Sequence, residues 1–335
     1  MTGRPLNIVA IGGGTGLATL LRGLKKSVHS DQDGSIESLS AIVTVTDEGG
    51  SSGVLRKQLS MLPPGDVRNC IVALAEEEQL LSRLFDYRFE GDSALKGHSL
   101  GNLLIAALTD IMGGFDEAIL AASEVLAIRG SIYPSTLSQV RLRALCSDGA
   151  VLLGETAISG DESRVHAPIV RLELDPSDVE PVTEAIDAIE SADMIVVGPG
   201  SLFTSVLPNL LIHRLADALR SSKALRVYIC NVMTQPRETD GYTAEDHLRA
   251  IFDHAGRVLD CVVVNSSRPS DPTLLAYAAQ QQFPVSFDLD KIQAMGVETC
   301  PAEIISEGNF LRHDADALAT TLASLWKGKR TMLSA

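Results

Sequence analysis

Five short runs of consecutive apolar residues recur along the 335-residue chain, and segments with helical periodicity separate them. Runs without in-out alternation are typical of strands covered on both faces, and strands that alternate with helices favour a parallel sheet between two helical layers. The sequence therefore predicts a three-layer, Rossmann-like α/β fold. The expected strands cover residues 7–11, 39–45, 194–197, 226–230 and 261–264. The expected helices cover residues 16–26, 66–89, 100–112, 115–126, 176–191, 203–221, 244–255 and 272–282.

Two regions interrupt this alternation. Helical patterns follow one another from about residue 66 to 128, which predicts a helical insertion. Two alternating strands around Ser-Asp-Gly predict an antiparallel hairpin over about 139–158, at an edge of the main sheet. The sequence contains no Pro-rich or Ser-rich linker and no repeat. We therefore expect one domain over residues 1–330, with a mobile surface loop at 29–38.

The charge of the chain limits its partners. It has 28 basic and 43 acidic residues, for a formal net charge of −15. Such a charge opposes binding to nucleic acid and to anionic lipid. The chain has no apolar run of the roughly 18 to 20 residues that cross a bilayer, and glycines follow its first apolar stretch where a signal peptide would continue. We expect a cytoplasmic protein that neither inserts into a membrane nor binds nucleic acid.

A glycine-rich turn follows the first expected strand and precedes a helix with an apolar stripe. Its residues are Gly12, Gly13, Gly14, Thr15 and Gly16. Glycines permit close backbone approach, and the N-terminus of a helix presents free N–H groups and a partial positive charge to a phosphate. The dinucleotide fingerprint is incomplete, because its third glycine would be Leu17 or Thr19, and no Walker lysine is present.

A similar turn follows the third expected strand. Gly198 and Gly200 flank Pro199, and Ser201 follows at the start of the next helix. Proline presets the turn and Gly200 leaves room for a ligand, while Ser201 is placed to cap the helix or to bind an anion. The same pattern is also typical of a turn without a ligand.

The second turn carries most of the charged candidates. An acidic pair follows the second expected strand, and a flexible Gly-Ser loop, two arginines and a further aspartate come next. Asp47 is a candidate to hold a sugar hydroxyl, to coordinate Mg²⁺ or to accept a proton in catalysis, and Asp66 is also a candidate N-cap of the following helix. The candidate ligand contacts of this segment are Asp47, Gly49, Ser51, Ser52, Arg56, Asp66, Arg68 and Asn69.

All three turns follow parallel strands, so we expect them on one rim of the sheet, where open α/β sheets bind their ligands. Three such turns exceed what one mononucleotide phosphate needs and favour a diphosphate-linked ligand, either a nucleotide sugar or a dinucleotide. Further polar residues near helix starts and strand ends complete the predicted site. They are His98, Asn102, Thr234, Gln235, Tyr277 and Arg312.

Six motifs occur together and in a characteristic order: GGGTGL, VTVTDEGGSSG, PPGDVRNCIVALA, GHSLGNLL, GPGSLFTSVLPNLL and NVMTQPRETDGYT. In this respect the chain resembles the YvcK-type gluconeogenesis factors, within the CofD-like family that contains 2-phospho-L-lactate transferase. The resemblance implies a Rossmann-like fold, a cytoplasmic bacterial protein and a UDP-sugar ligand such as UDP-GlcNAc. The chain departs from the family pattern at Glu48, Val54 and Arg237.

Three functions are compatible with these patterns. The resemblance favours a regulatory factor, without a required reaction, that binds a nucleotide sugar and links gluconeogenic growth to cell shape and envelope metabolism. The alternative is a Mg²⁺-dependent transferase that moves a phospho-group from a nucleotide diphosphate-type donor to a hydroxyl, with Asp47 as the catalytic residue. An NAD-dependent dehydrogenase ranks last, although NAD is a further candidate occupant. A homo-oligomer and a protein partner from envelope synthesis stay open.

Overall fold

The computed structural model describes residues 5–30, 35–76, 78–92, 94–159, 166–308 and 310–333. Its centre is a parallel sheet with the strand order β10-β9-β8-β7-β1-β2-β3. The strands are β1 (Leu6–Gly12), β2 (Ile36–Val43), β3 (Ser131–Pro134), β7 (Met194–Val197), β8 (Leu225–Ile229), β9 (Cys261–Asn265) and β10 (Glu298–Ala302). The five predicted strands are confirmed. Sequence periodicity missed β3 and β10, which are short, partly exposed edge strands that each contain a proline.

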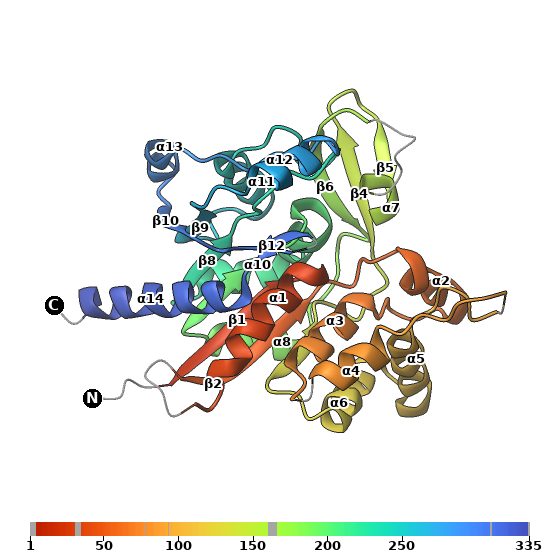
Figure 1. Ribbon diagram of the computed structural model, residues 1–335. Coiled ribbons are helices and arrows are strands. Elements are labelled where there is room, and N and C mark those ends of the chain that lie inside the picture. Colours follow the sequence, from red (N-terminus) through yellow and green to blue (C-terminus); the bar gives the residue numbers. More distant parts are fainter. Residues whose placement is uncertain are drawn as a thin grey trace.

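The strand order reverses between β1 and β7, and this reversal places helices on both faces of the sheet. Helix α1 (Gly14–Leu24) contacts both α3 (Gly65–Leu74) and α14 (Ala315–Leu333) on one face. Helices α8 (Thr183–Ser191) and α10 (His213–Ser221) contact each other on the opposite face (Figure 1). The predicted three-layer α/β fold is therefore confirmed.

The core lies where the sheet meets α1. All four residues of β7 are buried, as expected of a strand covered on both faces. On α1, Leu17, Leu20 and Leu21 are fully buried, and their spacing matches the helical period. This packing fixes the first glycine turn, which joins β1 to α1, between the sheet and a rigid helix.

The helical insertion between β2 and β3 is also confirmed, with two differences in detail. It contains α2 (Gly50–Leu59), α3, α4 (Glu78–Phe85), α5 (Leu100–Met112) and α6 (Phe115–Val125). The predicted helix over 66–89 is divided into α3 and α4, because the backbone is extended at Ala75. The prediction of a flexible Gly-Ser loop was wrong, because that loop is the first turn of α2.

The antiparallel hairpin is present as β4 (Arg141–Cys146) and β5 (Val151–Leu153). It pairs with β6 (Ile169–Asp175) in a three-stranded sheet of its own, rather than with an edge strand of the main sheet. The chain leaves the hairpin at Gly154, where φ is +85°, and continues as helix α7 (Glu155–Ser159) instead of strand. We call β4, β5, β6 and α7 the small-sheet module.

The remaining elements are short except for α11. They are a 3₁₀ turn (Lys25–Ser27), a π-helical turn (Leu202–Val206), α9 (Leu207–Leu210), α11 (Ala244–Ala255), α12 (Asp271–Ala278), α13 (Leu289–Ala294), β11 (Ile305–Glu307) and β12 (Leu311–His313). The predicted helix over 203–221 is thus three pieces. Residues 31–34 of the predicted surface loop lie outside the described residues, and β2 already begins at Ile36. In the described part of the chain, no helix has the length and apolar character needed to span a bilayer.

Candidate functional site

The first and third glycine turns lie side by side where the strand order reverses. The N–H of Gly198 donates to the carbonyl of Ile11 at 2.8 Å, which joins the two turns at their base. A Cβ atom on Gly16 would collide with the carbonyl of Pro199, so the two backbones are in direct contact there. At Gly14, φ is +63°, a conformation that favours glycine. The predicted shared rim is therefore present for these two turns.

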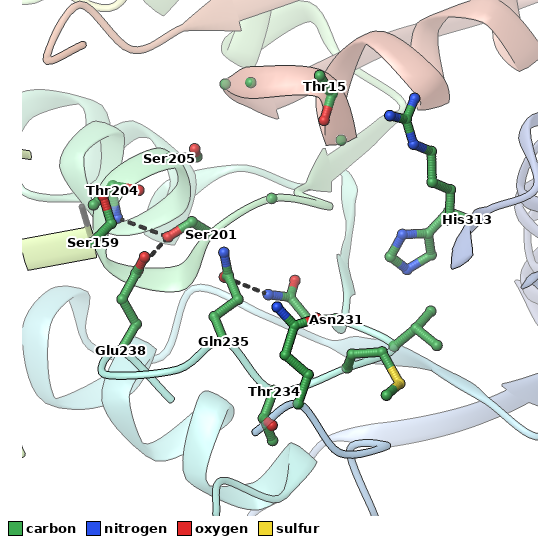
Figure 2. A pocket seen from close by; sticks show the side chains of 18 of the residues that line it. Thr15, Ser159, Ser201, Thr204, Ser205, Asn231, Thr234, Gln235, Glu238 and His313 are labelled. Carbon is green, nitrogen blue, oxygen red and sulfur yellow. Dashed lines mark hydrogen bonds between the residues drawn. The ribbon is translucent and has the colours of Figure 1, made fainter. Parts of the chain in front are cut away.

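A cavity of about 480 Å³, here called the first cavity, opens above this contact. Its walls combine backbone of the two turns with polar side chains from the loop after β8 and from β12 (Figure 2). Ten predicted site residues line it: Gly13, Gly14, Thr15, Gly16, Gly200, Ser201, Thr234, Gln235, Tyr277 and Arg312. The first cavity is thus the part of the predicted site that lies at the carboxyl ends of the parallel strands.

The loop after β8 is held in shape by its own hydrogen bonds. The Asn231 amide donates to the Gln235 side-chain oxygen at 3.2 Å, and the Thr234 hydroxyl accepts from the N–H of Phe283 at 3.0 Å. The Tyr277 hydroxyl accepts from the N–H of Leu311 at 2.8 Å and so anchors β12. Neutral amides and hydroxyls in fixed positions are groups that can recognise a base or a ribose.

Two titratable groups that line the first cavity have shifted pKa values. Ser201 donates to the carboxylate of Glu238, and it also caps the following turn by accepting from the N–H of Thr204 at 3.3 Å. Burial raises the pKa of Glu238 above its ordinary value. Burial also lowers the pKa of His313 to about 4, and this ring hydrogen-bonds to the Cys230 carbonyl at 3.1 Å through Nε2. His313 is therefore neutral at pH 7.

A second cavity of about 520 Å³ lies beside the first and shares Thr15 and Arg312 with it. It is bounded by α1 and by the starts of α2, α3 and α5, so the helical insertion supplies most of its walls. Eight further predicted site residues line it: Asp47, Gly49, Ser51, Ser52, Asp66, Arg68, Asn69 and Asn102. The single diphosphate pocket expected from the sequence is therefore divided into two cavities.

Three carboxylates lie close together near the boundary between the cavities. Burial and the neighbouring Asp47 carboxylate raise the pKa of Asp66 to about 7 and that of Glu155 to about 8. Asp66 accepts a hydrogen bond from the N–H of Gly14. Its predicted role as an N-cap was wrong, because α3 begins one residue earlier, at Gly65, with Pro64 in the N-cap position. In the described part of the chain, no group of three acidic, His or Cys residues has metal-binding geometry by itself.

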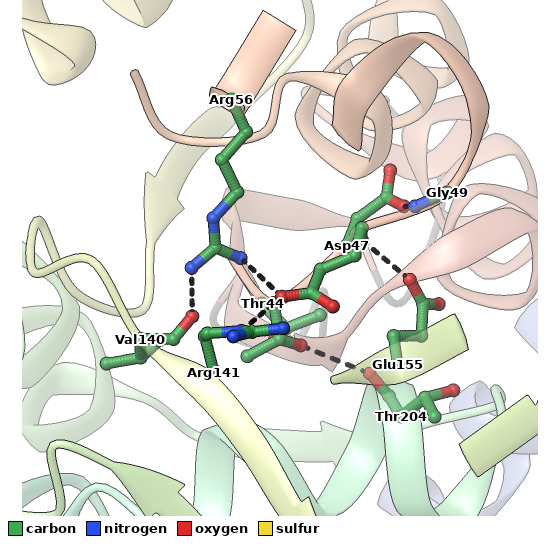
Figure 3. A network of polar contacts seen from close by, with 10 residues as sticks. Thr44, Asp47, Gly49, Arg56, Val140, Arg141, Glu155 and Thr204 are labelled. Atoms are coloured by element: carbon green, nitrogen blue, oxygen red, sulfur yellow. Dashed lines mark hydrogen bonds and ion pairs between the residues drawn. The ribbon is translucent and has the colours of Figure 1, made fainter. Parts of the chain in front are cut away.

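Arg56, a predicted phosphate contact, lines neither cavity. Its guanidinium donates to the carbonyl of Val140 and lies 3.8 Å from the carboxylate of Glu48 (Figure 3). Glu48 also accepts from Arg141 at 2.9 Å, and its N–H donates to Glu155 at 2.9 Å. The second turn is therefore fastened to the small-sheet module.

Three other predicted residues line neither cavity but support them. Gly12 and Gly198 pack behind the first cavity, where a Cβ atom on Gly12 would lie 3.8 Å from the Gly198 Cα. The His98 ring hydrogen-bonds to the Ser51 hydroxyl at 3.0 Å and so positions the start of α2. Ser99, rather than His98, caps α5 by accepting from the N–H of Asn102 at 3.2 Å.

Sequence reasoning missed several residues that line the first cavity, among them Glu155, Asn231, Glu238 and His313. Asn231 and Glu238 flank Thr234 and Gln235, which were predicted from the same polar loop. The polar character of the whole loop could therefore have indicated them. His313 follows the predicted Arg312 directly. Glu155 lies on the small-sheet module, and no local pattern connects it with Asp47 more than a hundred residues earlier.

Glycine turns at a strand-order reversal, each followed by a helical segment, place the protein in the Rossmann-like α/β class. The family model described as 2-phospho-L-lactate transferase CofD matches residues 8–305. The chain therefore belongs to the CofD family.

Its relatives confirm the resemblance to the gluconeogenesis factors. The gluconeogenesis factor of Bacillus subtilis is 43% identical over 97% of this chain and 99% of its own length. That of Halalkalibacterium halodurans is 46% identical over 94% of this chain and 95% of its own length. A crystal structure of a UPF0052 family member from Bacillus halodurans has a TM-score of 0.88 and 46% identity, covering 95% of this chain and 99% of that chain.

Proposed function

We propose that the protein binds a nucleotide diphosphate-type ligand in the first cavity, with a UDP-sugar such as UDP-GlcNAc as the leading candidate. The observation that carries this proposal is the direct backbone contact between the first and third glycine turns. Two adjacent turns, each leading into a helical segment, offer N–H groups and partial positive charge to two neighbouring phosphates. A single phosphate would need only one of them.

The nucleoside end of the ligand would lie against the loop after β8. Asn231 and Gln235 present amides there, and such groups pair with the polar edge of a pyrimidine base. A cavity of about 480 Å³ falls within the range of small-molecule sites, roughly 300 to 1,000 Å³. A nucleotide sugar therefore suits both the polarity and the size of the first cavity.

The biological role that we propose is regulatory. The relatives are named gluconeogenesis factors, which supports a link to growth on gluconeogenic carbon sources. Binding of a nucleotide sugar would connect that carbon flow with envelope synthesis and cell shape, through a cytoplasmic protein partner. This role requires a change of state on binding and no chemical reaction.

Calorimetric titration with UDP-GlcNAc, GDP and NAD tests the ligand class. We expect UDP-GlcNAc to bind with one site per chain and more tightly than GDP or NAD. Absence of binding by any UDP-sugar would contradict the proposal, and tighter binding of NAD would make the first cavity a dinucleotide site. Gln235→Leu serves as the variant within the first cavity, and Gln139→Leu, an exposed residue remote from it, is the matched control.

A second candidate function is a Mg²⁺-dependent transferase, which fits the description of the family model. The specific observation in its favour is the carboxylate group of Asp47, Asp66 and Glu155 beside the first turn. Asp47 and Asp66 would hold Mg²⁺ together with phosphate oxygens, and the ion would neutralise charge on the phospho-group. The hydroxyl oxygen would bond to phosphorus, the nucleoside monophosphate would leave, and Asp47 would take the hydroxyl proton.

Phosphorus NMR separates the two functions. Wild type and Asp47→Asn are incubated with UDP-GlcNAc, Mg²⁺ and a hydroxyl acceptor such as glycerol. Release of nucleoside monophosphate by wild type alone would support the transferase. Intact UDP-GlcNAc in both samples, with binding retained in calorimetry, would support the regulatory function.

A further inference from the structure

Arg237 lies in the loop after β8 and has an unusual backbone conformation. Its φ is +74°, in the left-handed region where a residue other than glycine is strained. Two hydrogen bonds close the loop around it. Its own N–H donates to Asp240 at 2.7 Å, and the N–H of Glu238 donates to the Gln235 carbonyl at 3.1 Å. Glycine would adopt this backbone without strain, so the presence of arginine points to a role for its side chain.

The side chain of Arg237 connects this loop with the small-sheet module. Its Nη2 donates to the carbonyl of Ser159 at 3.1 Å, and Ser159 is the last residue of α7. The last carbonyls of a helix have no N–H partner within it, so a cationic donor is favourable there. At the other end of α7, the Glu155 carboxylate accepts from the N–H of Glu48 at 2.9 Å. Helix α7 is therefore held at both ends, by the second turn and by the loop after β8.

Helix α7 forms part of the wall of the first cavity, whereas Arg237 does not line it. Figure 2 shows Ser159 and Glu238 on one side of the cavity and His313 on the other. The side of α7 is rich in hydroxyl and carboxyl groups, which belong to Glu155, Ser159, Ser201, Ser205 and Glu238. Arg237 can therefore act on a ligand only through the residues that it holds in place.

The chemistry of this side suits the sugar of a nucleotide sugar. A hydroxyl side chain donates and accepts, and a carboxyl oxygen accepts from O–H groups. In the proposed function the phosphates lie at the glycine turns and the base lies against Asn231 and Gln235, so the sugar can lie against α7. We infer that Arg237 is a positioning residue for sugar recognition, because it fixes the helix whose side chains face the sugar hydroxyls. This inference rests on the proposed function and deepens it.

Calorimetry with UDP-GlcNAc and UDP as probes tests this inference on wild type and Arg237→Gly. The two probes share the nucleotide and differ in the sugar. We expect the variant to bind UDP-GlcNAc at least about fivefold more weakly, which corresponds to about 1 kcal/mol, and to change UDP affinity by less than about twofold. Arg237→Lys keeps a cationic donor and should recover part of the UDP-GlcNAc affinity. A general loss of structure in the first cavity would instead weaken both probes alike.

Amide hydrogen exchange tests the contact between Arg237 and α7 without any ligand. The amides of α7 should exchange faster in Arg237→Gly than in wild type, because the helix loses one of its two attachments. The matched control is Ala127→Gly, at an exposed residue with φ of +45° that lines neither cavity. It also replaces a strained residue by glycine, and it should leave α7 exchange and both affinities unchanged. Thermal melts establish that each variant is folded.

Three results would overturn the inference while wild type binds UDP-GlcNAc. They are unchanged α7 exchange in Arg237→Gly, unchanged UDP-GlcNAc affinity in that variant, and equal weakening of both probes. Absence of UDP-GlcNAc binding by wild type would contradict the proposed function, and the inference that rests on it would fall with it. The two failures are therefore distinguished by the wild-type titration.

Discussion

The two cavities share a boundary but are built from different parts of the fold. The first is walled by backbone of two glycine turns and by mostly uncharged side chains near the carboxyl ends of the strands. The second has more charged side chains, and the helical insertion supplies most of its walls. The rule that open α/β sheets bind ligands at the carboxyl ends of their strands therefore locates the first cavity. The second cavity depends on the helices inserted between β2 and β3. Variants that affect one cavity and spare the other test this distinction.

The largest expected effect comes from Gly16→Ala. The added Cβ would collide with the Pro199 carbonyl, so the two glycine turns would separate. We expect a loss of about 1–3 kcal/mol in the free energy of unfolding from overpacking. UDP-GlcNAc affinity should fall by at least about thirtyfold, or about 2 kcal/mol. Denaturant titration and calorimetry measure the two effects.

The matched control is Gly328→Ala on the exposed side of α14, where a Cβ atom meets no neighbour. Alanine is the better helix former, so this change should leave binding unchanged and raise the free energy of unfolding by up to about 1 kcal/mol. Normal nucleotide binding by Gly16→Ala would show that contact between the two turns does not form the first cavity.

A different pattern is expected for Arg312→Gln, because Arg312 lines both cavities. A charged hydrogen bond contributes about 1.5–3 kcal/mol, so the affinity for UDP-GlcNAc should fall by about tenfold or more. Calorimetry on wild type and variant measures the change. Unchanged UDP-GlcNAc affinity would show that Arg312 does not contact the ligand of the first cavity.

The acidic boundary between the cavities should make stability depend on pH. Asp66 and Glu155 have folded-state pKa values of about 7 and about 8, above their ordinary values of 3.8 and 4.5. Protons therefore favour the folded state, and this contribution is lost as the pH rises through 7 to 8. The free energy of unfolding should fall between pH 5 and 8, by at most about 1.4 kcal/mol per pH unit for each group.

Denaturant titrations at several pH values, on wild type and Asp66→Asn, measure this effect. The variant lacks one of the two titrating groups, so its free energy of unfolding should vary less steeply with pH. A free energy that rises between pH 5 and 8 in wild type would contradict the raised pKa values of these two carboxyls in the folded protein.

The smallest effect is expected for Arg141→Gln, outside both cavities. Arg141 pairs with Glu48 and its side chain is 54% exposed, so the pair should contribute only about 0.2–1 kcal/mol to the free energy of unfolding. Ligand affinity should not change, because Arg141 lines neither cavity. Loss of binding in calorimetry would instead mean that the small-sheet module positions Asp47 through this contact.

Periodicity predicted the sheet well because buried parallel strands carry continuous apolar runs, as β7 does. It missed β3 and β10 because an edge strand has little apolar surface to bury, so nothing separates its sequence from a loop. The glycine turns were predicted because close backbone contact requires glycine, and glycines can be recognised directly in the sequence. The division into two cavities could not be predicted, because it depends on how Arg68 and Asn102 meet across helices that are far apart along the chain.

The same limitation applies to Arg56. Its spacing after the second turn suits a phosphate contact, yet in the structure it contacts the carbonyl of Val140, just before β4, and lies near Glu48 of its own turn. A pattern within one segment cannot show which distant segment competes for a side chain. Glu155 was missed for the same reason, since its proximity to Asp47 arises only when the module packs on the second turn.

Thr15 and Arg312 form a wall common to the two cavities, so an occupant of one cavity would touch residues that also line the other. If ligands occupied both cavities and one changed the affinity for the other by some factor, the second would change the affinity for the first by that same factor. The two boundary residues would then set how strongly the two occupants are coupled.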